Sequence, residues 1–116
     1  MHELGIAHSV LEAVREEAAR YPGAVPVKVA VRIGELSGVN ADALSFGFDA
    51  LKAETEWASL ELEIQTVPRE QRCLECGTVF RVVDYDFVCP SCSSVRTECI
   101  GGDQMELAYL ELDESP

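Results

Sequence analysis

Four cysteines in two matched pairs are the residues of this chain with the clearest chemistry. Cys73 and Cys76 are separated by two residues, as are Cys89 and Cys92, and twelve residues lie between the pairs. Two residues between cysteines allow both thiolates to face one ion, and four thiolates meet the tetrahedral preference of zinc. The competing interpretations are a redox dithiol and a rubredoxin-like iron site. We interpret the cluster as structural zinc, because four protein ligands leave no position for water or substrate.

The segment that carries these cysteines is too small to build a core of its own, so we expect its folding to depend on the metal. Gly77 accommodates the tight turn after the second sulfur. The interval between the pairs is long enough for a hairpin, built on four apolar residues: Val79, Phe80, Val82 and Val83. The fifth cysteine, Cys99, has no evident mate, and we interpret it as a small half-buried residue rather than a reactive thiol.

The composition describes a small acidic protein. Its 116 residues are 47% apolar, which supports one modest core and leaves no room for two large domains. Nine lysines and arginines face 21 aspartates and glutamates, a net charge of -12, so neither nucleic acid nor an anionic membrane is an expected partner. The sequence shows neither an export signal nor a bilayer-length apolar run, which predicts a cytoplasmic protein whose paired cysteines bind metal.

Hydrophobic periodicity predicts a larger unit around the cysteine segment. Apolar residues at helical spacing run from Leu4 to Ala18, and we expect this first helix to end near residues 21–23, Tyr-Pro-Gly. A second helix is expected from a cap at Asn40 to about Glu54. Period-two alternation predicts strands at residues 27–33 and 60–65, and a third strand is expected at residues 105–112. The third has apolar residues on both faces, so its register stays open and a bulge is allowed.

The predicted fold class is therefore α/β. It comprises a small three-stranded sheet with two helices, plus a zinc-ribbon module inserted before the last strand. The expected domains are an α/β domain formed by residues 1–69 and 99–116, and a zinc-binding module formed by residues 70–98.

Three further motifs lie in a fixed order along the chain. It begins Met1-His2-Glu3, carries Gly34-Glu35-Leu36-Ser37-Gly38 after the first predicted strand, and opens its last strand with Met105-Glu106-Leu107. With both cysteine pairs, these motifs make the chain resemble the HypA/HybF family of nickel chaperones over nearly its whole length.

The resemblance implies a carrier and not an enzyme. It implies delivery of Ni(II) for maturation of [NiFe]-hydrogenase, with a GTPase of the maturation pathway and the hydrogenase large subunit precursor as partners. In some organisms of the family nickel is also supplied to urease, which adds urease accessory proteins as partners. The α/β domain would then be the nickel-binding domain.

The first three residues have the chemistry for this role. The terminal amine of Met1, the backbone nitrogen and imidazole Nδ1 of His2, and the backbone nitrogen of Glu3 can complete a planar set of four nitrogens. Ni(II) accepts square-planar nitrogen ligands and zinc resists them, so geometry could separate the two metals. Alternatively, the Glu3 carboxylate gives a mixed nitrogen and oxygen set closer to octahedral. The sequence leaves both sets open.

Four other polar residues have simpler explanations. His8 is expected to be an ordinary surface histidine of the first helix. Some family members place a carboxylate where this chain has Asn40, which puts an auxiliary nickel ligand in doubt. Asp42 could substitute, although helix-start acidity explains it more simply. Glu35 is expected to be a loop residue, with a partner contact as its functional alternative.

Two rival functions follow from the same residues. The principal one is a zinc-ribbon module for protein interaction, without a nickel role. A zinc hydrolase is disfavoured, because the sequence shows neither an open zinc position nor a nucleophile with a nearby base.

Overall fold

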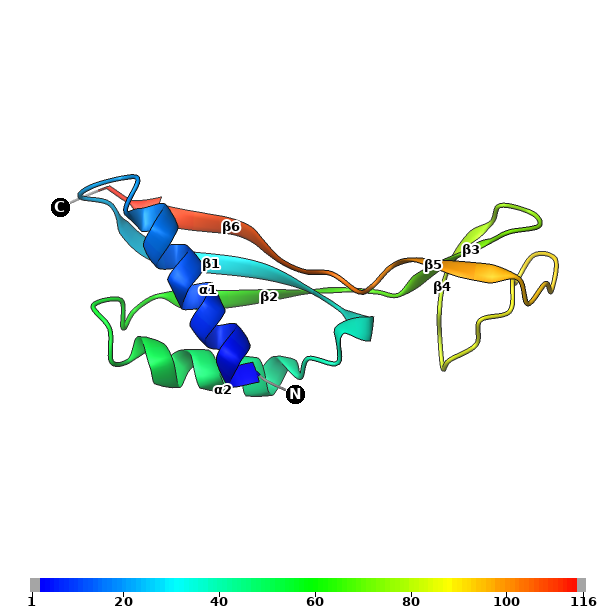
Figure 1. Ribbon diagram of the computed structural model, residues 1–116, viewed down its shortest axis with the longest axis horizontal. Coiled ribbons are helices and arrows are strands. Elements are labelled where there is room, and N and C mark those ends of the chain that lie inside the picture. The colour runs from blue at the N-terminus through cyan, green and yellow to red at the C-terminus, as the bar shows by residue number, and fades with distance from the viewer. Residues whose placement is uncertain (1–2, 115–116) are drawn as a thin grey trace. The chain divides into compact units, whose positions relative to one another are not determined.

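The structure, a computed structural model, describes residues 3–114, and it divides the chain into two compact units (Figure 1). The first, here called the helical unit, comprises Met1–Arg32, Gly38–Gln65 and Glu106–Pro116. The second, the cysteine unit, comprises Ile33–Ser37 and Thr66–Met105. Among the described residues, no helix is long and apolar enough to cross a membrane.

Two helices and a three-stranded sheet make up most of the helical unit. The helices are α1 (Glu3–Ala18) and α2 (Ala41–Lys52), and they pack against each other. The sheet has the order β2-β1-β6, formed by β1 (Val25–Gly34), β2 (Glu61–Val67) and β6 (Met105–Asp113). This confirms the predicted small three-stranded sheet with two helices.

The core of the helical unit follows the predicted periodicities. Buried side chains come from one stripe of each helix and from β1, where Val29 and Val31 follow the predicted alternation and Ala30, between them, is buried as well. They include Ala7, Val10, Leu11, Val14, Val29, Ala30, Val31, Leu44 and Phe48. Leu4, expected on the same stripe, is 58% exposed because it lies in the first turn of α1, at the edge of the core.

The ends of the helices show how local chemistry sets their length. The Asn40 side chain caps α2 as predicted, because its Oδ1 accepts the backbone N–H of Ala43 at 2.9 Å. Helix α1 ends at Ala18, earlier than expected, because the next N–H groups form tighter i to i−3 bonds: Arg20 N–H to Glu17 O and Tyr21 N–H to Ala18 O, both at 3.1 Å.

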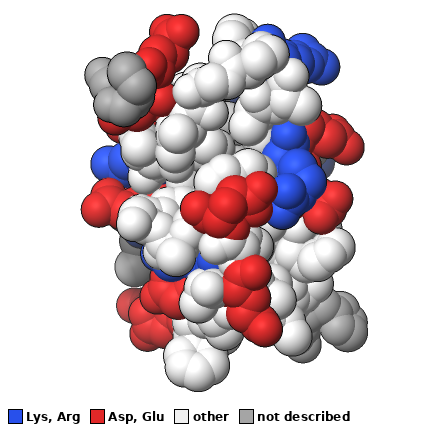
Figure 2. All heavy atoms as spheres, turned by 90° about the vertical axis from the view of Figure 1, so that its left-hand side faces the viewer, with Lys and Arg blue, Asp and Glu red and all other residues white. Residues whose placement is uncertain are grey.

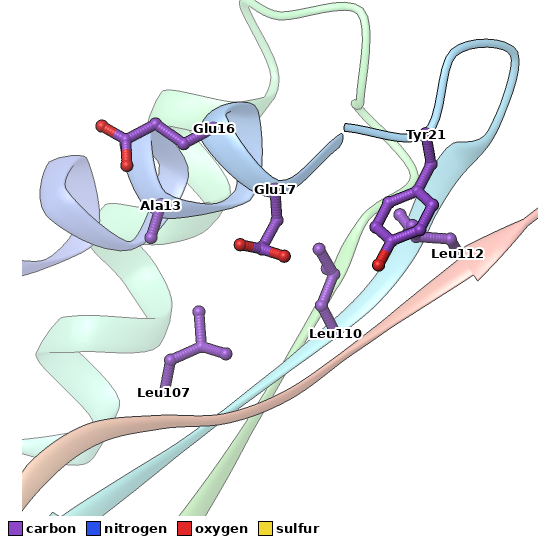
Figure 3. A pocket seen from close by; sticks show the side chains of 7 residues that line it. All are labelled: Ala13, Glu16, Glu17, Tyr21, Leu107, Leu110 and Leu112. Carbon is purple, nitrogen blue, oxygen red and sulfur yellow. The ribbon is translucent and has the colours of Figure 1, made fainter. Parts of the chain in front are cut away.

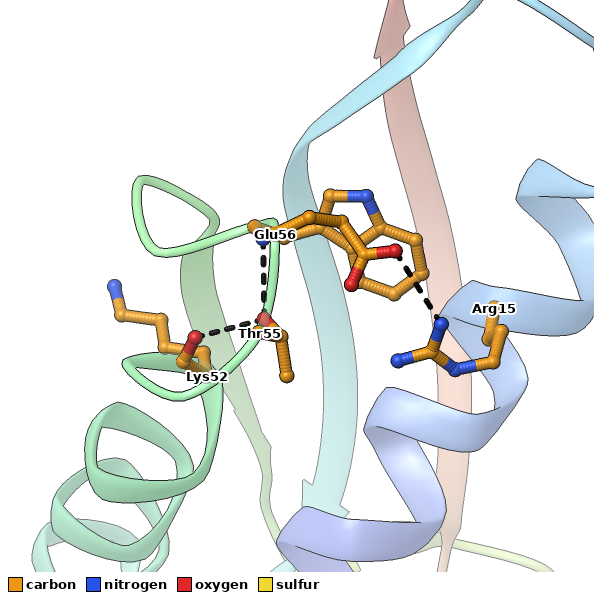
Figure 4. A network of polar contacts seen from close by, with 5 residues as sticks. Arg15, Lys52, Thr55 and Glu56 are labelled. Carbon is orange, nitrogen blue, oxygen red and sulfur yellow. Dashed lines mark hydrogen bonds and ion pairs between the residues drawn. The ribbon is translucent and has the colours of Figure 1, made fainter.

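The loop between α2 and β2 is tied to α1 by a small polar network (Figure 4). The Arg15 guanidinium lies 4.7 Å from the centroid of the Trp57 ring and forms an ion pair with Glu56 at 3.5 Å. Thr55 Oγ1 donates to Lys52 O at 2.7 Å and accepts the Trp57 N–H at 3.1 Å. This places Trp57, the single tryptophan of the chain, beside α1 within the helical unit.

The cysteine unit contains a second, short sheet in the order β4-β3-β5. Its antiparallel strands are β3 (Glu70–Cys73), β4 (Val79–Arg81) and β5 (Thr97–Gly101). These strands lie between β2 and β6 in the chain, where the zinc-ribbon module was predicted.

The predicted hairpin between the cysteine pairs is wrong. Val79 pairs with Arg72 and Phe80 pairs with Gln71, so β4 forms its hairpin with β3. The first cysteine turn is itself the reversal of that hairpin, because it brings the chain back beside β3. Val83 forms only an isolated bridge with Asp86 in the segment that follows.

The Gly-Glu-Leu-Ser motif enters the cysteine unit as a short 3₁₀ turn, η1 (Glu35–Ser37). Gly34 N–H donates to Gln104 O at 2.8 Å and Leu36 N–H donates to Gly102 O at 2.6 Å. A Cβ at position 34 would lie 2.0 Å from the Gly102 carbonyl oxygen, so only glycine allows this close approach.

Glu35 also has a structural partner within the cysteine unit. Its Oε1 accepts the backbone N–H of Arg69 at 2.7 Å and lies 3.7 Å from the Arg81 guanidinium. Glu35, expected to be a loop residue, therefore links the 3₁₀ turn after β1 to Arg69, just before β3, and to Arg81, the last residue of β4.

Candidate metal centre

The four cysteines converge on one point. Their Sγ atoms all lie within 4.8 Å of one another, with separations of 3.5 Å for Cys73 to Cys92 and for Cys76 to Cys89. A tetrahedral zinc ion with Zn–S bonds of about 2.3 Å holds its sulfurs about 3.8 Å apart. The cluster therefore fits zinc with small adjustments, and its all-thiolate donor set suits that metal.

The first cysteine turn is built from backbone bonds around its own residues. Cys73 N–H donates to Thr78 O at 2.9 Å, and Gly77 N–H donates to Cys73 O at 3.0 Å. Gly77 has φ 77°, as the predicted tight turn requires. Cys76 N–H points at the Cys73 sulfur, 3.4 Å away, so the backbone also stabilises negative charge there.

The second turn repeats the first with a different residue at its corner. Cys89 N–H donates to Ser94 O and Ser93 N–H donates to Cys89 O, both at 2.9 Å. Ser93 corresponds to Gly77 of the first turn and has φ 64°. This left-handed conformation is energetically unfavourable for a residue with a side chain. Each turn thus contributes one buried cysteine, Cys73 or Cys89, and one exposed cysteine, Cys76 or Cys92.

The sulfur environment favours a bound cation over four separate thiols. Hydrogen bonds from Thr78, whose Oγ1 lies 3.1 Å from the Cys76 sulfur, lower the pKa of Cys76 to about 6. At Cys92 the Ser94 backbone N–H lowers the pKa, but the Cys73 thiol and burial outweigh it and raise the pKa to about 12. Four thiolates so close together repel one another unless a divalent cation replaces the protons.

A buried polar network supports the cysteine turns. Gln71 is only 4% exposed, and its amide donates to Thr97 Oγ1 at 3.0 Å, which donates in turn to Phe87 O at 2.9 Å. Arg69 Nε donates to Gln71 Oε1 at 3.2 Å while its guanidinium lies 4.4 Å from the Phe87 ring centroid. Sequence reasoning missed these residues, because polar side chains in a short strand give no periodic signal.

The N-terminal candidates are only partly visible. Met1 and His2 lie outside the described residues, whereas Glu3 is the first residue of α1. The Glu3 carboxylate accepts the backbone N–H of Asn40 at 3.0 Å, so the structure joins the first residues of α1 to the capped start of α2. Asn40, where some family members have a carboxylate, therefore lies next to Glu3 of the N-terminal motif.

The remaining candidates do not join a metal cluster. Within residues 3–114, the four cysteines are the group of at least three ligand-type side chains close enough to hold one ion. His8 is exposed and lies 3.9 Å from Glu12, as expected of a surface histidine, and Asp42 lies in the first turn of α2. Cys99 is exposed rather than half-buried, because it lies on β5, an edge strand with exposed neighbours.

The fold and the cysteine cluster define a small α/β protein with a zinc-ribbon module. The chain also matches, over residues 1–112, the family described as hydrogenase/urease nickel incorporation, metallochaperone, hypA. It belongs to this HypA family, which confirms the resemblance seen in its motifs.

Relatives and solved structures agree with this membership. The hydrogenase maturation factor HypA of Roseiflexus sp. (strain RS-1) is 43% identical over 115 residues, covering 98% of this chain and 94% of that protein. The hydrogenase maturation factor HypA of Alkalilimnicola ehrlichii is 36% identical over 113 residues, covering 97% of this chain and 100% of that protein.

Two solution structures share the fold. One, of a HypA protein, has a TM-score of 0.72 and 27% identity, covering 99% of this chain and 98% of its own. The other, of the Ni metallochaperone HypA from Helicobacter pylori, has a TM-score of 0.61 and 30% identity, covering 97% of each chain.

Proposed function

We propose that this chain carries Ni(II) on its first three residues and delivers it during maturation of [NiFe]-hydrogenase. The observation that carries the proposal is membership, over residues 1–112, of a family described as a nickel-incorporation metallochaperone. The relatives named above are hydrogenase maturation factors, and one solution structure is of a Ni metallochaperone. Met1-His2-Glu3 supplies an amine, an imidazole and backbone nitrogens at the chain terminus.

The position of Glu3 favours the planar nitrogen set over a set with its carboxylate. The N–H groups in the first turn of a helix have no intrahelical acceptor, so deprotonating the Glu3 nitrogen breaks no helical bond. The positive end of the helix dipole also stabilises the resulting negative charge. The Glu3 carboxylate already accepts the Asn40 N–H, which gives it a structural task at this site.

The wider assignment follows from the same family and charge. Residues 1–69 and 99–116 form the nickel-binding domain, and residues 70–98 hold Zn(II) through Cys73, Cys76, Cys89 and Cys92. The zinc is structural, and the protein is a cytoplasmic carrier with no catalytic activity of its own. Its partners are the GTPase of the maturation pathway and the hydrogenase large subunit precursor, with urease accessory proteins as a further destination. The net charge of -12 argues against nucleic acid and anionic membrane.

Nickel titration of the untagged, zinc-loaded chain tests this proposal. His2→Ala and a short N-terminal extension should each abolish tight Ni(II) binding in calorimetry, because each removes one nitrogen of the chelate. Zinc content and circular dichroism should stay unchanged in both variants, and His8→Ala serves as the matched control. Tight nickel binding retained in both the substituted and the extended chain would show that the terminal residues are not the ligands.

A protein-interaction module without nickel is the second candidate, and one observation favours it. The cysteine unit exposes several large apolar side chains, including Leu74, Val83, Tyr85 and Val95. The same titration separates the candidates, since an interaction module would show no tight nickel site in the unmodified chain.

A further inference from the structure

A groove with an apolar floor lies within the helical unit, between α1 and β6 (Figure 3). Its volume is about 500 Å³. Ala13, Glu16 and Glu17 of α1 line one side, with Tyr21 just beyond the helix, and three leucines of β6 line the other. These leucines are Leu107, Leu110 and Leu112.

The leucines gather on the groove in a way that strict alternation along β6 does not produce. Leu110 and Leu112 share one face of a regular strand, and Leu107 would lie on the other, yet all three line the groove. Leu107 is 39% exposed and Tyr21 is 53% exposed. Apolar surface left open beside an edge strand is a common property of sites that another molecule covers.

The charge around the groove is negative. Glu16 is exposed and forms no ion pair with any residue in the described range 3–114, while Glu17 pairs with the exposed Arg20 at 3.7 Å. The helical unit carries 14 acidic and five basic side chains, against seven and four in the cysteine unit. Figure 2 shows acidic side chains spread over the face in view, with basic side chains between them.

We propose that this groove binds an amphipathic basic segment of a partner protein. The leucine-type side chains of the segment would cover Leu107, Leu110 and Leu112, and its lysines or arginines would lie over Glu16 and Glu17. A second copy of this chain is a poor occupant, because pairing at the groove would bring two units with a net charge of -9 together. The inference goes beyond nickel binding and does not depend on it.

Three synthetic peptides of equal length test the proposal against the zinc-loaded, isotopically labelled full chain. The first places leucines at helical spacing with lysines between them, the second replaces the lysines by glutamates, and the third shuffles the first so that it has no apolar face. The first peptide should shift the amide signals of residues 13–21 and 107–112. No binding by it, equal binding by the others, or shifts confined to other residues would overturn the proposal.

Charge reversal gives the matched comparison. The double variant Glu16→Lys with Glu17→Lys should weaken binding of the first peptide by about tenfold, since two attractive pairs become repulsive. The control, Glu54→Lys with Glu61→Lys, changes the net charge equally but alters exposed residues outside the groove, and it should retain most of the affinity. Equal losses would show that only net charge attracts the peptide and would refute the groove.

Sedimentation of the chain without peptide tests the rival occupant. The chain should have the same mass as its Leu107→Asp variant. If the substitution converts a dimer into a monomer, a second copy covers the groove and the proposal is wrong.

Discussion

Ser93 and Gly77 occupy the same corner of the two cysteine turns, with φ 64° and φ 77°. An L-residue in this left-handed conformation destabilises the folded state by about 1–2 kcal/mol, whereas glycine adopts it without strain. Glycine, however, loses more conformational entropy on folding, which costs about 0.5–1 kcal/mol. Ser93→Gly should therefore stabilise the folded module by about 0.5–1 kcal/mol. Gly77→Ser should destabilise it by a similar amount, because a Cβ at Gly77 meets no atom within 4 Å and only the backbone strain changes.

Zinc affinity is the appropriate measurement, because we expect folding of so small a module to be coupled to metal binding. The expected free energies correspond to about two- to fivefold tighter zinc binding for Ser93→Gly and a similar weakening for Gly77→Ser. Competition with a chromophoric chelator reports both. Ser91→Gly is the matched control, since Ser91 lies in the same turn without a positive φ, and it should not tighten binding. Changes of the same sign at Ser93 and Gly77 would refute the argument from backbone conformation.

Two further predictions concern the polar networks of the two units. Gln71→Leu removes the donor to the Thr97 hydroxyl and the acceptor of Arg69 Nε from a part-buried network. We expect a loss of about 1–3 kcal/mol in stability and faster zinc release to a chelator. An unchanged release rate would exclude this supporting role. Hydrogen bonds lower the pKa of Glu63, first the bond from Gln65 and then the bond from Lys28. The ionised carboxylate therefore stabilises the fold fully above the unfolded-state pKa of about 4.3. This stabilisation is lost as the pH falls through the lowered pKa of the folded state. Glu63→Gln should therefore flatten the acid-side loss of stability below about pH 4.3, followed by Trp57 fluorescence, and an identical pH profile would contradict it.

The parts of the fold that sequence could predict depend on neighbours along the chain. The helical stripe through Ala7, Leu11 and Val14, the alternation of β1 and the cap at Asn40 are all readable within a few residues. The metal cluster was predictable for the same reason, because two residues between the cysteines of a pair allow both sulfurs to bind one ion.

The features that sequence missed depend on residues far apart in the chain. Glu35 meets Arg69 across 34 positions and Gln71 meets Thr97 across 26, and neither contact leaves a periodic pattern. The hairpin was misplaced because Val79 and Phe80 fit a strand equally well with a partner on either side. Only the turn at Cys73–Cys76, which reverses the chain, decides in favour of β3.

The neighbouring Glu3 and Asn40 bear on the proposed nickel site, because some family members have a carboxylate where this chain has Asn40. Asparagine caps a helix as well as aspartate does, so the Asn40 to Ala43 bond and the start of α2 are preserved. The bond from the Asn40 backbone to the Glu3 carboxylate does not involve the side chain at position 40 at all. Asparagine removes only a negative charge. The proposed chelate of two deprotonated backbone nitrogens, one amine and one imidazole would not need that charge, because it would itself neutralise Ni(II). The neutral side chain at position 40 is therefore consistent with nickel held by the terminal nitrogens rather than by carboxylates.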